Sequence, residues 1–129
     1  MKIVHRRSRW ALPAALMLCG CSPPAIDVTV FVEKGRLMAR LSQDWGLFFS
    51  HKNAPCVRLA QLVPHSDLDA PVWKIEAKGD VQCLHLSSFA IGGPPPDGFK
   101  EVVPLAPGTK GMHRLDVLGI GGGEADLAL

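Results

Sequence analysis

The sequence predicts an all-β protein, a single antiparallel β-sandwich that follows a short helical leader. Apolar and polar residues alternate with a period of two along most of the chain after residue 25, which is typical of strands with one buried face. Glycine and proline clusters separate these runs, as tight turns between short strands require. No stretch after the leader has the 3.6-residue period of an amphipathic helix.

The chain begins with a basic segment and a short apolar run. Ala11 to Leu18 form the apolar run, and before it stand four basic residues, Lys2, Arg6, Arg7 and Arg9. A run of about eight to ten residues is roughly half of the ~20 that a helix needs to span a bilayer. This order predicts a cleaved secretory signal peptide over residues 1–20.

The tetrapeptide Leu18-Cys19-Gly20-Cys21 follows directly. It resembles the lipobox of bacterial lipoproteins, in which a small residue precedes an invariant cysteine. The resemblance implies that Cys21 becomes the first residue of the mature chain and carries a covalent diacylglycerol and acyl lipid such as palmitate. Cys19 is the competing acceptor, but Leu18 before it is too bulky for a subsite that takes small residues, and an unlipidated export signal is the other alternative. Residues 21–25 then form a short tether and residues 26–129 the domain.

Removal of the leader changes the charge of the chain. All twelve acidic residues but only ten of the fourteen basic ones follow Cys21, so the net charge falls from +2 to −2. Such a domain lacks the basic surface that nucleic-acid binding requires. We therefore expect no nucleic-acid partner, a lipid membrane as partner through the anchor, and an envelope protein as a possible second partner. By analogy with enterobacterial sorting, Ser22 after the cysteine favours the outer membrane, with the domain facing the periplasm.

The first predicted strands form a hairpin. Ile26, Val28, Val30 and Val32 alternate with polar residues, and residues 37–41 alternate in the same way. Between them, Lys34-Gly35 supplies a turn, because glycine adopts the positive φ that two-residue hairpin loops need.

Further strands follow from the same alternation. Lys78 to Asp80 predicts a turn and the three glycines from Gly121 to Gly123 predict the last one, whereas the glycine–proline segment 92–98 predicts a stiff connection between sheets. The predicted strands after the hairpin are residues 56–63, 73–77, 81–91, 99–103, 113–117 and 125–129.

The segment Leu105-Ala106-Pro107-Gly108-Thr109, with the alternating strand to Val117 after it, is similar to the end of a fibronectin type III or related immunoglobulin-like sandwich. The resemblance implies the arrangement of strands of that fold. Gly111 stands where that family places a tyrosine, and the chain contains no tyrosine.

Cys56 and Cys83 are the two thiols that remain after lipidation of Cys21. In an oxidising compartment they are expected to form a disulfide. The alternative is a pair of free thiols, one or both of them available to a metal.

The sharpest metal hypothesis rests on Cys83 and His85, which would share one face of a strand, with His113 as a third ligand. The ligand spacing typical of copper or structural zinc sites is missing, and scattered surface histidines are the simpler interpretation. A hydrolase hypothesis rests on His65-Ser66-Asp67, which ordinary turn chemistry explains as well. We expect no cofactor besides the lipid on Cys21.

Trp45, Phe48 and Phe49 form the densest aromatic group. Core packing is the favoured interpretation, and an exposed patch for a partner or a membrane is the alternative. The sequence thus predicts a membrane-anchored envelope lipoprotein that acts as a non-enzymatic binding or envelope-assembly module. A periplasmic copper- or zinc-binding protein and a hydrolase of unrecognised type are the alternatives.

Overall fold

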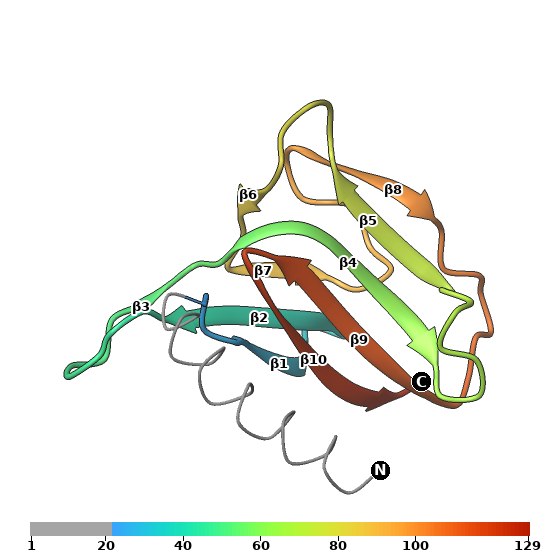
Figure 1. Ribbon diagram of the computed structural model, residues 1–129. Helices are drawn as coiled ribbons and strands as arrows, with labels where there is room; N and C mark the ends of the chain where they lie inside the picture. The colour runs from blue at the N-terminus through green and yellow to red at the C-terminus, as the bar shows by residue number, and fades with distance from the viewer. Residues whose placement is uncertain (1–21) are drawn as a thin grey trace, which may run out of the picture.

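The computed structural model describes residues 22–129 (Figure 1). The predicted signal peptide and both Cys19 and Cys21 lie outside the described residues. Ten strands are present in the described part of the chain. They are β1 (Ile26–Glu33), β2 (Arg36–Asp44), β3 (Lys52–Asn53), β4 (Cys56–Pro64), β5 (Trp73–Ala77), β6 (Leu84–His85), β7 (Ser88–Ala90), β8 (Phe99–Val103), β9 (Met112–Gly119) and β10 (Gly121–Ala128).

These strands form two antiparallel sheets, as the alternation predicts. In the first sheet β2 lies between β1 on one side and β3 and β7 on the other. The second sheet has the order β10-β9-β4-β5-β8, with β6 paired to the start of β4. The sheets are open rather than joined into a barrel (Figure 1). Buried apolar side chains from both sheets form the core.

The first hairpin is confirmed residue by residue. Glu33 pairs with Arg36, so Lys34 and Gly35 form a two-residue loop. Both have positive φ, 51° and 75°, and this is the backbone of a type I′ turn, whose twist matches that of the strands it joins. The segment 92–98 connects β7 in the first sheet to β8 in the second, as its composition predicts.

Two predicted boundaries were wrong. Residues 81–91 contain two short strands instead of one, because β6 pairs with β4 while β7 crosses to pair with β2 in the other sheet. Gly121 to Gly123 belong to β10 and not to a turn; β9 turns into β10 at Ile120.

Close approach of neighbouring backbone explains the glycines of this region. A Cβ atom on Gly119 would collide with the carbonyl oxygen of Cys56, and one on Gly123 with that of Ile26. Gly121 has φ 88° and lies against Pro24. Glycine at positions 121 and 123 therefore lets β10 pack tightly against residues 24–26, which a larger side chain would prevent.

The core is continuous between the sheets. Trp73 of β5 stacks on Phe89 of β7, with 5.9 Å between ring centroids, and so joins the second sheet to the first. Side chains from β2, β4, β9 and β10 surround this pair, among them Ala39, Leu41, Val57, Leu62, Leu115 and Leu127.

Candidate functional site

The loop that joins β2 to β3, residues 45–51, extends beyond both sheets as the long teal-to-green turn in Figure 1. Its base is closed by the pairing of Asp44 with Lys52 and by a hydrogen bond from the Trp45 amide to the carbonyl of His51, 3.0 Å. We call this segment the apolar loop and its residues Leu47, Phe48 and Phe49 the tip.

The Asp44 carboxylate holds the apolar loop together. Its Oδ1 accepts hydrogen bonds from the amides of Gly46, 2.9 Å, and His51, 2.8 Å, and its Oδ2 accepts one from the hydroxyl of Ser50, 3.0 Å. The bonds from His51 and then Gly46 are the main reason why the pKa of Asp44 lies below its usual range. Short polar side chains of this kind commonly order turns by binding nearby backbone amides.

Gly46 makes the turn of the loop possible. A Cβ atom at this position would collide with the carbonyl oxygen of Phe49. The chain therefore folds back on itself within four residues, and the side chains between are directed outward.

The tip is almost entirely in solvent. Leu47, Phe48 and Phe49 are 94%, 91% and 87% exposed, the largest exposed fractions among the large apolar side chains that the structure describes. Core packing, the favoured interpretation of this aromatic group, was therefore wrong. The reason is the turn at Gly46 and the three hydrogen bonds that the Asp44 carboxylate accepts, which we call the Asp44 clamp. Together they make the segment a hairpin loop, whereas core packing would require a strand covered by the second sheet.

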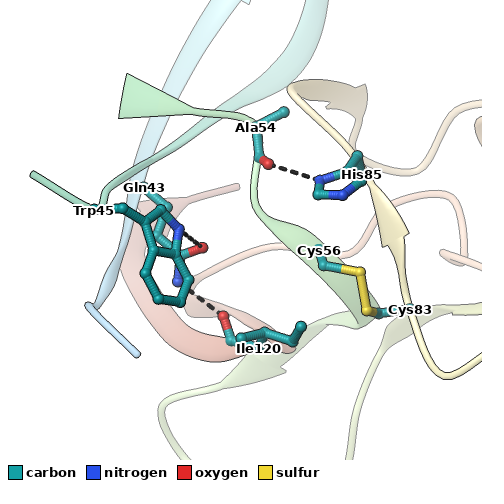
Figure 2. Close-up of a disulfide and its surroundings, with 7 residues drawn as sticks. All are labelled: Gln43, Trp45, Ala54, Cys56, Cys83, His85 and Ile120. Atoms are coloured by element: carbon teal, nitrogen blue, oxygen red, sulfur yellow. Dashed lines mark hydrogen bonds between the residues drawn. A yellow bond between two sulfur atoms is a disulfide. The ribbon is translucent and has the colours of Figure 1, made fainter. Parts of the chain in front are cut away.

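Trp45 lies at the base of the apolar loop, about half exposed, and is held by Gln43 (Figure 2). Its indole Nε1 donates to the side-chain oxygen of Gln43, 3.1 Å. The amide nitrogen of Gln43 donates to the carbonyls of Pro24 and Ile120, both at 2.8 Å. One buried amide thus joins Trp45, the N-terminal segment and the β9–β10 turn.

Gln43 was not among the functional residues predicted from the sequence. A signal was present, because Gln43 continues the inward series Leu37, Ala39, Leu41 of β2. A polar residue at an inward position must find hydrogen-bond partners, and so such a residue often marks a junction of several segments.

A cleft of about 370 Å³ opens beside Trp45. Its lining includes Ile120, His85 and Cys56, and Figure 2 shows His85 and the disulfide on the side away from Trp45. The Nδ1 atom of His85 is 3.0 Å from the carbonyl oxygen of Ala54. The cleft is mostly apolar, and Trp45 is the residue of the apolar loop that lines it.

The disulfide between Cys56 and Cys83 is confirmed, with 5.3 Å between the Cα atoms. It joins the first residue of β4 to the residue before β6, next to the pairing of Cys56 with His85. Free thiols at these positions, the alternative interpretation, are thereby contradicted.

The candidate metal ligands are not brought together. Cys83 is used in the disulfide, and His85 and His113 pair with opposite ends of β4, at Cys56 and Pro64. Eight residues of strand separate these ends, roughly 26 Å. His113 is buried, with Nδ1 2.9 Å from the carbonyl oxygen of Gly111. Within residues 22–129, no three His, Cys, Asp or Glu side chains form a cluster that could hold a metal ion.

The segment His65-Ser66-Asp67 forms a turn. Asp67 accepts a hydrogen bond from the amide of Asp69, 3.1 Å, and the His65 ring contacts Asp126 of β10 at 2.9 Å. Turn chemistry therefore accounts for Asp67, and the partner of His65 comes from a different element.

No known protein family, curated protein or solved structure matches the chain. Among residues 22–129, the structure contains no helix long and apolar enough to cross a bilayer. The most distinctive surface of the described residues is the apolar loop with the cleft behind it.

Proposed function

We propose that this protein is a lipid-anchored envelope lipoprotein whose β-sandwich acts as a non-enzymatic binding module. We propose the apolar loop as its binding surface. The observation that carries the proposal is the tip, in which three consecutive large apolar side chains are nearly fully exposed on a loop closed by hydrogen bonds to Asp44.

Exposure of this kind is unfavourable for a protein that binds nothing with it. Burial of each such side chain stabilises a folded or bound state by about 1.5–3 kcal/mol. Contiguous exposed apolar side chains typically mark interaction surfaces. Because the Asp44 clamp already orders the loop, binding need not order it again, and this lowers the entropic cost of association.

The start of the described chain supports the anchor. Pro24 is held by Gln43, so only Ser22 and Pro23 separate Cys21 from the folded domain. Two residues span at most ~7 Å. A lipid on Cys21, as the lipobox resemblance implies, would keep the domain against the membrane, which we propose to be the periplasmic face of the outer membrane.

The order of strands supports an immunoglobulin-like sandwich, the fold that the segment from Leu105 resembles. In such domains strands A, B and E share one sheet, and C, F and G share the other. Here β1, β2 and β7 correspond to A, B and E, while β4, β9 and β10 correspond to C, F and G. Immunoglobulin-like sandwiches commonly present binding loops at their ends.

Intact mass spectrometry of protein extracted from membranes tests the anchor. The full chain is expected to yield a species that begins at Cys21 and carries a diacylglycerol and an acyl group. Cys21→Ser should abolish this species. Cys19→Ser is the matched control and should leave it unchanged. Lipid on Cys19, or a processed chain with unmodified Cys21, would overturn the proposal.

A further inference from the structure

We propose that the tip inserts into the surface of the same bilayer that holds the lipid on Cys21, so that the domain is fixed at two points. This inference rests on the proposed function for the position of the domain but names the partner of the apolar loop. Its partner is the lipid surface and not a second protein.

The tether and the apolar loop leave the sandwich at the same end. Ile26, the first residue of β1, pairs with Gln43 near the end of β2, and the apolar loop starts two residues later. The carbonyl of Pro24 is bound to the same Gln43 that holds Trp45. In Figure 1 the blue start of the described chain accordingly lies beside the base of the loop.

The two segments also have similar reach. Between paired Asp44 and Lys52 there are seven residues, so the loop can extend about three residues from its base, roughly 10 Å. Residues 22 and 23 span at most ~7 Å. A bilayer surface close enough to hold Cys21 is therefore within reach of the tip, whose side chains would enter the interfacial layer.

The chemistry of the loop fits a lipid surface. Residues 45–53 contain no acidic side chain, and Lys52 at the base supplies a positive charge for lipid phosphates. The Asp44 carboxylate beside it is already satisfied by hydrogen bonds within the loop. Trp45, half exposed behind the tip, occupies the position of an aromatic residue at a membrane interface.

The shape of the tip distinguishes lipid from protein. Protein interfaces typically combine a packed apolar centre with a polar rim on a complementary surface. The tip instead exposes three adjacent side chains, each by more than four-fifths, at the end of a narrow hairpin loop. A fluid acyl layer can surround such a projection on every side. Ile120, about half exposed beside Trp45, extends the apolar surface behind it.

Quenching of Trp45 fluorescence by brominated lipids tests the insertion. The full chain is processed in cells, purified in detergent and reconstituted into phosphatidylethanolamine–phosphatidylglycerol vesicles with or without bromine on the acyl chains. The processed chain retains Trp45 and Trp73, and Trp73 is fully buried toward the opposite end of β4. Brominated lipid should therefore quench the Trp45 component selectively.

Serine at all three tip positions, Leu47→Ser with Phe48→Ser and Phe49→Ser, should reduce this quenching at least twofold, and Phe48→Ser alone should reduce it partly. Val32→Ser is the matched control, because Val32 is 70% exposed but lies at the opposite end of the β1–β2 hairpin. It should leave the quenching unchanged. Circular dichroism and an intact disulfide check that each variant is folded.

Intact mass spectrometry of each sample reports whether Cys21 carries lipid, and so distinguishes failure of tip insertion from failure of the proposed function. Equal quenching in the tip variant, or none in the lipidated parent chain, would overturn insertion and leave the anchor standing. A tip-dependent crosslink to a protein without quenching would likewise overturn it. If Cys21 carries no lipid, the proposed function fails. Tip-dependent quenching by added vesicles would in that case still support lipid binding by the apolar loop. Absence of that quenching would refute lipid binding by the loop as well.

Discussion

Removal of the Cys56–Cys83 disulfide should destabilise the domain by an amount that the structure allows us to estimate. The bridge closes a loop with a sequence separation of 27 residues. In the chain-entropy treatment, a loop of that length corresponds to about 3.5 kcal/mol of stability. Small domains have a free energy of unfolding of about 5–15 kcal/mol, so the bridge contributes a large share.

The double variant Cys56→Ala with Cys83→Ala is compared with the parent chain by urea unfolding, followed through Trp73 fluorescence. For a denaturant slope of about 2 kcal/mol/M, the midpoint should fall by roughly 1.8 M. Reduction of the parent chain should produce a similar fall. The control Val81→Ala truncates an exposed side chain in the same loop and should leave the midpoint unchanged. A fall of less than about 0.4 M in the double variant would show that the bridge contributes little to stability.

Three further changes concern the base of the apolar loop. Gln43→Ala leaves the carbonyls of Pro24 and Ile120 without their donor. We expect the free energy of unfolding, measured in urea, to fall by about 1–3 kcal/mol per buried unsatisfied group. An unchanged urea midpoint would show that Gln43 does not stabilise this junction. Because the pKa of Asp44 is lowered in the folded loop, its hydrogen bonds should hold at neutral pH and be lost as the pH falls through that lowered value. Protection of the Gly46 amide from hydrogen exchange, relative to its intrinsic rate, reports this loss, and Asp44→Ala, which removes the acceptor, should show no protection at any pH. Gly46→Ala should change the Trp45 emission spectrum while leaving the urea midpoint nearly unchanged, whereas identical spectra would show that the turn does not need glycine.

Local signals made much of the fold predictable. The β1–β2 hairpin follows from alternation and from Gly35, and both signals act between residues close in sequence. The disulfide was predictable because Cys56 and Cys83 are the two cysteines outside the predicted signal peptide and lipidation site, and an oxidising compartment was expected.

Features that depend on distant partners could not be read from the sequence. Gly123 is required because Ile26, almost a hundred residues earlier, lies against it. The strand predicted over residues 81–91 divides because its two halves pair with different sheets, and only the tertiary fold determines that choice.

The exposure of the tip was missed for a related reason. Large aromatic residues are most often buried, and nothing in the sequence near Phe48 shows that Asp44 will close a loop across seven residues. The clamp needs a carboxylate, a glycine and a returning strand in the right geometry. Each of these is common by itself, so their combination becomes visible only in the folded structure.

Photocrosslinking from position 48 in living cells identifies what the tip contacts. A photoreactive phenylalanine analogue replaces Phe48 in the full chain, and a matched chain carries it at Ser66, an exposed position just beyond the opposite end of β4. We expect lipid adducts at position 48, identified by intact mass, and few or none at position 66. Equal adducts at the two positions, or protein adducts alone at position 48, would contradict insertion of the tip into the bilayer.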